Sequence, residues 1–430
     1  MDPALGLAVS VLLAAVWLER RVAVARVAMW RRVAAGQGLV PMDAVADPRP
    51  RSLRVGREGL VVRFEPSTAD GTPRGPRITA VRGTRIVLEA PEQLPGSFAL
   101  RAEGFGSTVQ KALGHAELEI GDPAFDRRFR IDGLPSTVCA VLDAKTRVAL
   151  TALADRVSFQ IRAGELQVDV PGLVSTEAET ARVLEEVLRL GRLLPRHEDL
   201  TVALVDNARS DPERAVRMQC VRLLVREHLA HPATRPALEV CCGDEWMEIR
   251  LCAALALGTD GYRTLDDVAA ASTDDRFSAA AVVGLGAALP PHRAQKWLLE
   301  ALKEGRVGTA AACVARLGET GGAGVEDTLL SILSRDRPHE EALRVTTAEA
   351  LRRVGSAAAV LPLREMAEGA AVDWRLRRAS REAIAEIQSR LGRASPGQLS
   401  LAVAETGQVS LAKAETGSVS LDAEDPAGKS

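Results

Sequence analysis

The residue types that most often carry catalysis or bind metals are few in this chain, and they are not spaced for either role. The histidines are His115, His197, His228, His231, His292 and His339. None lies in the HExxH arrangement that presents two imidazoles to zinc from one helix face. His228 and His231 lie beside Pro232 at the expected end of a helix, where structural roles are more common. We therefore predict no catalytic residue, no metal and no cofactor.

The cysteines point to buried thiols. They are Cys139, Cys220, Cys241, Cys242, Cys252 and Cys313. An even number is compatible with disulfides, but a chain of 430 residues can bury a hydrophobic core and does not need the disulfide bonds that stabilise a small secreted domain. Adjacent Cys241 and Cys242 cannot readily pair with each other, and most of the six lie in apolar runs with helical periodicity. No CxxC is present, which argues against a zinc site and a thioredoxin-like motif.

Glycine-rich and acidic segments also lack a catalytic context. Residues 104–106 and 318–324 do not follow a strand and open a helix, so we expect loops. Gly428-Lys429-Ser430 ends like a P-loop, but Ala423 stands where the first glycine would be. The carboxylate pairs at 266–267 and 274–275 fall at helix starts, where capping explains them.

Composition narrows the classes of function. The chain is 47% hydrophobic and 26% charged, which is ample for packed cores, and its length predicts two or three domains. Only 3% of residues are aromatic, too few for base-stacking platforms. The formal net charge is −2, and the C-terminal half has a slight acidic excess rather than a basic stripe. We expect no nucleic-acid partner.

The chain starts with an uncharged segment. Residues 4–18 carry no charge and would cover roughly 22 Å as a helix, so neighbouring residues must help to span a hydrocarbon core of about 30 Å. Arginines follow rather than precede the segment, and no small-residue cleavage site follows it, which argues against a signal peptide. The alternative is a buried or interfacial helix in a soluble protein.

We predict a single-pass anchor in the inner membrane with the bulk of the chain cytoplasmic, because positive charge gathers on the cytoplasmic side. The basic helix beyond the anchor would contact membrane lipid. The predicted anchor residues are Leu5, Leu7, Val9, Val11, Leu12, Leu13, Val16, Trp17 and Leu18. The residues that set the orientation are Arg20, Arg21, Arg26, Arg31 and Arg32.

A β-rich region follows a linker. Strand-like runs at 60–64, 78–81, 85–90, 98–102, 117–120 and 125–131 are separated by turn residues. Residues 157–161 and 166–170 alternate apolar with polar around Ala163-Gly164, which predicts a hairpin with one buried face. Asp143 is expected to cap a helix from Ala144 to about Ala154.

The segment 121–131 resembles part of an uncharacterised bacterial membrane-associated domain with an FDxxFxV-type strand. The resemblance covers about fifty residues and implies no chemistry. A simpler interpretation is that Phe125 and Phe129 face a core while Asp126, Arg127 and Arg128 are solvated.

The periodicity becomes helical from residue 175, where Ser175 or Thr176 with Glu179 forms a capping box for a helix to about Leu194. Six imperfect copies of a unit of about 28–34 residues follow between 198 and 391. The second helix of each unit carries a polar start, small residues and often a final glycine. This pattern resembles HEAT-like repeats, and the resemblance implies an α-solenoid. The signature residues are Asp211, Arg217, Asp244, Arg250, Arg344 and Arg377. Copies three and four lack the arginine, which puts their polar contacts in question.

The chain ends in three decads, GQLSLAVAET, GQVSLAKAET and GSVSLDAEDP. Their low apolar content predicts disorder. They are either a tail without a role or a repeated peptide that adds to a partner's sheet edge.

Together these features predict an α+β multidomain chain. The expected parts are a membrane anchor with a basic helix at 1–36, a linker at 37–50, a β-rich domain at 51–174, a helical-repeat solenoid at 175–393 and a disordered tail at 394–430. The favoured function is a membrane-tethered scaffold that binds a protein partner through the solenoid. The alternative is a HEAT-like lyase or a subunit of a protein-modifying enzyme. The oligomeric state stays open.

Overall fold

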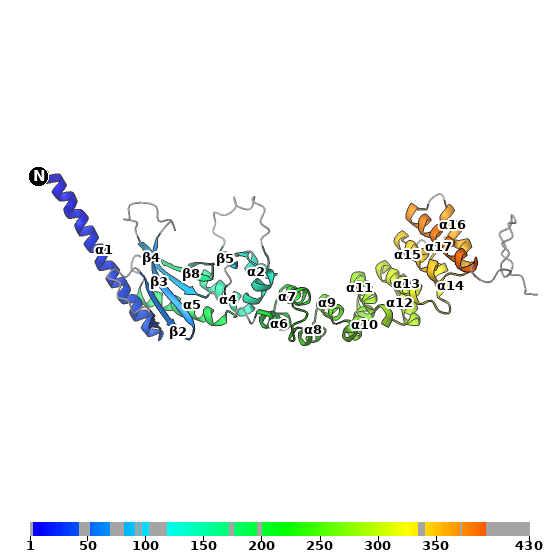
Figure 1. The fold of residues 1–430 in the computed structure, drawn as a ribbon, viewed down its shortest axis with the longest axis horizontal. Helices are drawn as coiled ribbons and strands as arrows, with labels where there is room; N and C mark the ends of the chain where they lie inside the picture. The colour runs from blue at the N-terminus through cyan, green and yellow to red at the C-terminus, as the bar shows by residue number, and fades with distance from the viewer. Residues whose placement is uncertain are drawn as a thin grey trace, which may run out of the picture. The chain divides into compact units, whose positions relative to one another are not determined.

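The computed structural model describes residues 3–42, 52–68, 81–90, 94, 97–102, 118–171, 176–195, 200–333, 340–369 and 372–392 (Figure 1). The predicted linker and tail lie mostly or wholly outside these residues. The chain divides into two compact units, Met1–Leu257 and Gly258–Ser430. We describe each unit by itself.

The first unit is built on an antiparallel sheet in the order β1-β2-β3-β4-β8-β7-β5-β6. Its strands are β1 (Val40–Pro41), β2 (Leu53–Arg57), β3 (Leu60–Thr68), β4 (Val81–Glu89), β5 (Ala99–Ala102), β6 (Phe129–Asp132), β7 (Ser158–Arg162) and β8 (Glu165–Pro171). The predicted β7–β8 hairpin is confirmed, and its turn places Ala163 and Gly164 at φ values of 52° and 81°. Positive φ at both turn positions matches the twist of the paired strands.

Alternation along the strands gives the sheet one apolar and one polar face. Phe64, Ile86 and Val168 are fully buried on the apolar face. Three helices pack against this face or against one another beside it. They are α1 (Pro3–Gly36), α4 (Ala144–Ala154) and α5 (Glu177–Leu193). Asp143 caps α4 and Thr176 caps α5 through backbone N–H groups, as predicted.

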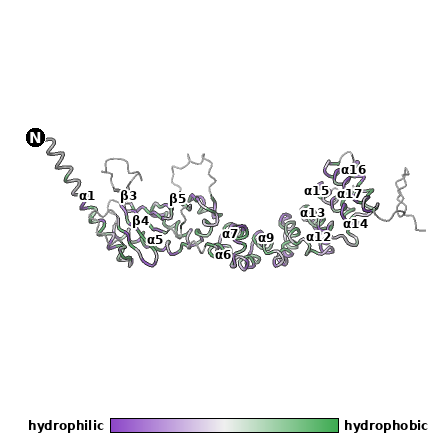
Figure 2. The backbone as a smooth tube through the Cα atoms, in the orientation of Figure 1, coloured by the Kyte–Doolittle hydropathy of each residue, from purple (hydrophilic) through white to green (hydrophobic). Residues whose placement is uncertain are grey.

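The C-terminal half of α1 is part of this core. Trp30 is 1% exposed, stacks on Phe64 with ring centroids 5.9 Å apart, and donates from Nε1 to Thr84 Oγ1 over 3.2 Å. Arg32 forms an ion pair with Glu177 of α5. Arg20 and Arg21 follow one another near the middle of α1, where Figure 2 shows hydrophilic residues beside the part of the helix that is drawn without a hydropathy colour.

The prediction of a membrane-spanning helix is wrong. Among the described residues, no helix is long and apolar enough to cross a membrane. The fold class with a transmembrane helix and the single-pass location in the inner membrane are corrected with it. The physical reason is that α1 continues through five arginines into a segment whose apolar face packs on the protein's own sheet.

The proposed anchor residues are therefore reassigned. Leu13, Trp17 and Leu18 are 63%, 57% and 59% exposed on α1. The orientation-setting residues Arg20, Arg21 and Arg31 are exposed, and Arg26 is half-buried. The side chains of the other proposed anchor residues lie outside the described set: Leu5, Leu7, Val9, Val11, Leu12 and Val16.

The segment 125–131 is not one strand. Helix α2 (Pro123–Asp126) precedes β6, and Phe125 and Phe129 are buried with ring centroids 4.4 Å apart. Asp126 is not simply solvated, because its carboxylate accepts from the backbone N–H groups of Ile120 and Gly121. The turn Gly121-Asp122-Pro123 starts a helix because Asp122 accepts from the N–H groups of Ala124 and Phe125.

Helix pairs complete the first unit. Helix α3 (Pro135–Val141) packs on both members of the first pair, α6 (Leu200–Ser210) and α7 (Arg214–Glu227). The second pair is α8 (Thr234–Cys241) and α9 (Met247–Leu257). Helices α6 and α7 contact α8 and α9 respectively, so the pairs are stacked in parallel rows.

In the part of the second unit that the structure describes, the α-helices form four pairs. The first helices are α10 (Tyr262–Ala271), α12 (Pro291–Glu304), α14 (Val325–Leu333) and α16 (Val360–Glu368). The second helices are α11 (Asp275–Leu285), α13 (Val307–Thr320), α15 (Glu341–Val354) and α17 (Trp374–Gly392). The second helices pack on one another in chain order, α11 on α13, α13 on α15 and α15 on α17.

Small residues allow this close packing. A Cβ atom added to Gly318 of α13 would lie 2.6 Å from the Cβ and 2.7 Å from the Cα of Ala350 on α15. The predicted role of small residues between neighbouring second helices is thus visible at this contact.

Candidate interaction surface

The described residues present no constellation for metal chemistry. Among them, no three His, Cys, Asp or Glu side chains lie close enough to hold a metal ion. His228 Nδ1 lies 3.2 Å from Thr201 Oγ1 at the end of α7.

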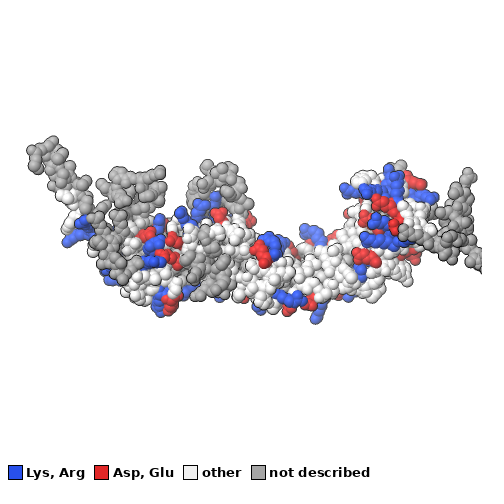
Figure 3. Space-filling view, viewed as in Figure 1, with Lys and Arg blue, Asp and Glu red and all other residues white. Residues whose placement is uncertain are grey.

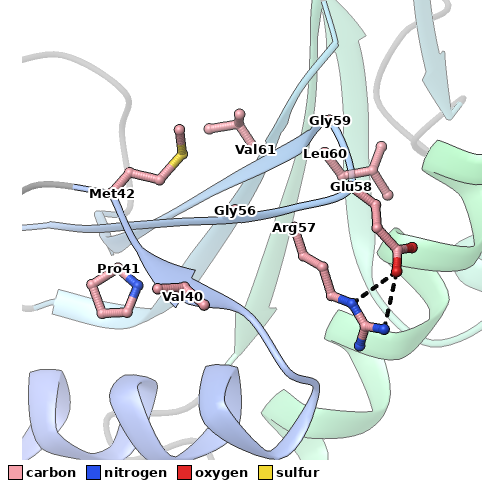
Figure 4. A pocket seen from close by; sticks show the side chains of 9 residues that line it. All are labelled: Val40, Pro41, Met42, Gly56, Arg57, Glu58, Gly59, Leu60 and Val61. Atoms are coloured by element: carbon pink, nitrogen blue, oxygen red, sulfur yellow. Dashed lines mark hydrogen bonds and ion pairs between the residues drawn. The ribbon is translucent and has the colours of Figure 1, made fainter.

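A cavity of about 330 Å³ lies beside β1 and the β2–β3 turn (Figure 4). Its one charged pair joins sequence neighbours Arg57 and Glu58. The walls hold no nucleophile with an adjacent base. They are formed by Val40, Pro41, Met42, Gly56, Arg57, Glu58, Gly59, Leu60 and Val61.

The polar face of the sheet carries a network of ion pairs. Arg63 pairs with Glu65, Glu89 and Glu165 over 2.5 to 3.0 Å. Arg85 of the next strand pairs with Asp169. Hydrogen bonds to these carboxylates keep the pKa values of both arginines above the ordinary value, although burial opposes this. Each of these two arginines is paired with at least one carboxylate of the same face.

A buried arginine connects the sheet part to the first helix pair. Arg147 of α4 donates to Asp122 Oδ2 over 2.8 Å and to both Asp211 oxygens over 2.9 and 3.0 Å. Its side chain is 4% exposed, and that of Asp211 is 0% exposed. Asp211 also accepts from the N–H of Glu213 at the start of α7. The predicted helix-start aspartate therefore has a second role, which sequence spacing alone did not indicate.

The next pair uses the same chemistry. Arg217 of α7 donates to Asp244 over 2.8 and 3.2 Å and to the carbonyl of Asp211 over 2.8 Å. Asp244 accepts from the N–H of Trp246 before α9. The predicted signature residues Asp211, Arg217 and Asp244 therefore form one continuous series of polar contacts, which starts at Arg147 of α4.

Two of the three remaining signature arginines bind carbonyl groups that end a preceding helix or loop. Arg344 donates to the carbonyl of Leu333, and Arg377 donates to those of Gly369 and Val372. The Nε atoms of Arg250, Arg344 and Arg377 are buried without a hydrogen-bond partner. These residues stabilise helix ends rather than forming a common site.

The copies that lack the arginine use an aspartate instead. Asp275 of α11 accepts from the N–H groups of Gly308 and Thr309 over 2.7 and 2.8 Å and from Thr309 Oγ1 over 2.7 Å. Arg306 adds a bond to Ser278 Oγ over 2.9 Å. The sequence left it open whether these copies make polar contacts with each other. They do, because the Asp275 carboxylate caps the neighbouring helix α13 rather than its own helix.

The Asp275 contact has a testable pH dependence. Burial alone would raise the pKa of Asp275, but the hydrogen bonds from Thr309 and Gly308 outweigh it and lower the pKa. We expect Asp275→Asn to destabilise the second unit by about 1–3 kcal/mol at pH 7, the range for hydrogen bonds to charged groups. Because the folded pKa lies below the unfolded one, this stability is present above about pH 4 and is lost as the pH falls through the folded pKa.

Urea unfolding of both proteins between pH 3 and pH 7 measures this difference. Asp274→Asn is the matched control, since Asp274 is a more exposed neighbour that caps α11 locally through the N–H of Arg276. A stability difference for Asp275→Asn that stays constant over the whole pH range contradicts the assignment.

The cysteines are all free, and four of the six are buried. Burial raises the pKa of Cys241 to about 11 and that of Cys313 to about 12. A hydrogen bond to the neighbouring Cys139 thiol, together with burial, raises the pKa of Cys220 well above its ordinary value. Such thiols are protonated at neutral pH and are poor nucleophiles.

What remains is an uncharged surface on the second unit. The sequence carries no charge from residue 277 to residue 289 or from residue 307 to residue 315. On α11 and α13 the positions opposite the buried ones are small or apolar, and Val283 is 69% exposed. We call this surface the second-helix face; it comprises Ala280, Val283, Ala311, Ala312, Ala315 and Val345. Figure 3 shows few charges over the region from α10 to α13, and dense charges of both signs over α15 to α17.

No model of a known protein family matches this chain, and no curated protein is similar to it. The resemblances to HEAT-like repeats and to a bacterial membrane-associated domain therefore have no support from relatives. The helix pairs are established by the structure alone.

Proposed function

We propose that this protein is an interaction protein that binds a protein partner through the second-helix face. The observation that carries the proposal is the uncharged surface of α11 and α13, on which Val283 is 69% exposed and the alanines around it are half-buried. An apolar patch with charges only at its edge is typical of a protein–protein interface.

The first helix of the pair α12 and α13 is highly charged, in contrast to the second, and this supports the choice of the second-helix face. Helix α12 carries Arg293, Lys296, Glu300, Lys303 and Glu304 within fourteen residues. A desolvated interface disfavours such charges because each would lose its hydration. In the pair α12 and α13, the first helix is therefore the solvated side, and the second helix is the side available to a partner.

The contacts that hold the second helices together support the same function. Asp275 joins α11 to α13, and Gly318 brings α13 against α15. Adjacent second helices are held at fixed spacing, so a partner meets a preformed surface and loses little free energy in ordering it.

The test compares two substitutions of matched chemistry in the full chain. Val283→Glu places a carboxylate at the centre of the second-helix face, and Leu361→Glu places one on α16, at a site that is 61% exposed. We expect a partner captured from host extract by crosslinking to bind at least about tenfold more weakly to Val283→Glu, since 1.4 kcal/mol of uncompensated desolvation has this effect.

The control Leu361→Glu is expected to bind the partner as the unmodified chain does. Equal capture by both variants, or capture of no specific protein by the unmodified chain, contradicts the proposal. Urea unfolding of both variants verifies that neither substitution changes stability by more than about 0.5 kcal/mol, as is usual for surface positions.

A further inference from the structure

Helix α1 has a second face that its own domain leaves uncovered. Val27, Trp30 and Ala34 are buried on the side that packs against the sheet. On a neighbouring side of the helix, about a quarter turn away, lie Leu13, Trp17, Val24 and Ala28. Leu13, Trp17 and Val24 are each more than half exposed, at 63%, 57% and 63%.

This uncovered side is strongly basic. From Arg20 to Gly36 the helix contains five arginines and no acidic residue. Arg20, Arg21 and Arg31 are exposed, and the Arg21 guanidinium lies 4.4 Å from the centre of the Trp17 ring. We call the surface formed by Leu13, Trp17, Arg20, Arg21, Val24 and Ala28 the α1 stripe. Because guanidinium groups alternate with apolar side chains along it, a well-matched occupant is both apolar and acidic.

The first and third C-terminal decads carry leucine beside acidic residues, whereas the second is neutral because Lys413 balances Glu415. In each decad a leucine is preceded two positions earlier by leucine or valine and followed four positions later by an acid. The leucine–acid pairs are Leu401 with Glu405, Leu411 with Glu415, and Leu421 with Asp425. Residues 397–430 contain five acidic and two basic residues, a net charge of −3.

We propose that the α1 stripe binds one C-terminal decad of a second copy of this chain. The stripe from Leu13 to Ala28 is about 22 Å long at 1.5 Å per residue, and an extended decad reaches at most about 36 Å. One extended decad is therefore long enough to cover one stripe, and the other two remain for further copies. Leucine and valine of the decad pack on Trp17 and Val24, and its carboxylate pairs with Arg20 or Arg21. This inference is independent of the second-helix face.

The experiment uses sedimentation velocity of the full chain at increasing concentration. We expect concentration-dependent association that an excess of a synthetic peptide of residues 397–430 reverses. Fluorescence anisotropy of the labelled peptide with the full chain gives the affinity directly. Because the attraction is between exposed charges, we expect the affinity to fall as salt rises from 0.05 to about 0.5 M.

The discriminating variant is Arg20→Glu with Arg21→Glu, which reverses two charges of the α1 stripe. We expect it to weaken peptide binding at least about tenfold. The matched control, Arg263→Glu with Arg381→Glu, changes the net charge equally at exposed positions of α10 and α17 and is expected to bind unchanged.

Three results would overturn the proposal. The first is equal binding by both double variants. The second is a chain that stays monomeric at all concentrations. This includes a chain that binds the peptide only after its own tail is removed, because the tail then occupies the α1 stripe of its own chain. The third is binding of phosphatidylglycerol vesicles that the peptide does not displace, which assigns the α1 stripe to a lipid surface.

Discussion

Replacing Arg147 by methionine is expected to destabilise the unit Met1–Leu257 by about 3–5 kcal/mol, which is the usual loss when one partner of a buried ion pair is removed. Arg147 supplies both hydrogen bonds to the fully buried carboxylate of Asp211 and a third to Asp122. Without the guanidinium, Asp211 keeps only the N–H of Glu213 as a donor. An uncompensated buried charge at the contact between α4 and α7 would separate the sheet part from the first helix pair.

Urea unfolding followed by circular dichroism measures this loss. Arg128→Met is the control, because Arg128 pairs with Asp155 at a site where the carboxylate side chain is 62% exposed. Exposed pairs contribute about 1 kcal/mol or less. The double variant Arg147→Met with Asp211→Leu removes both charges and is expected to recover most of the lost stability. A loss below 1 kcal/mol for Arg147→Met would show that the network is not a structural tie.

Replacing Trp30 by alanine is expected to cost about 3–5 kcal/mol, the range for a large aromatic residue truncated in a core. Trp30 is 1% exposed, and its ring covers Phe64 while its indole N–H reaches Thr84. The substitution removes both the apolar contact and the donor, and it leaves a cavity between α1 and the sheet.

Trp17→Ala on the same helix is the internal control. Its side chain is 57% exposed, so we expect a change within about 0.5 kcal/mol. Thermal unfolding of the two variants under one condition separates the core half of α1 from its exposed half. Equal effects of the two substitutions would contradict the position of Trp30 in the sheet core.

Helix α1 shows where the sequence was misleading. Residues 4–18 read as an anchor because charge is absent there, and the arginines that follow read as an orientation signal. Hydropathy does not report which face of a helix meets its own domain. Trp30 and Arg32 contact β4 and α5 residues that are 54 and 145 positions away, which no local pattern reveals.

The sequence predicted local features well where neighbouring residues decide them. Asp143 and Thr176 cap their helices because a side-chain oxygen needs only an N–H group three positions ahead. The hairpin at Ala163-Gly164 follows from alternation and turn chemistry within fourteen residues. By contrast, residues 125–131 divide into α2 and β6 because Asp122 and Asp126 satisfy nearby N–H groups, which alternation does not show.

The sequence by itself determined the caps of α4 and α5 and the β7–β8 hairpin, since each depends on residues within about one turn or one strand. Only the tertiary structure decided that Arg147 binds Asp211, that Asp275 caps a neighbouring helix, and that α11 and α13 expose an uncharged face. These features depend on which distant elements pack together. That choice is made by burial summed over the whole core, and no single segment encodes it.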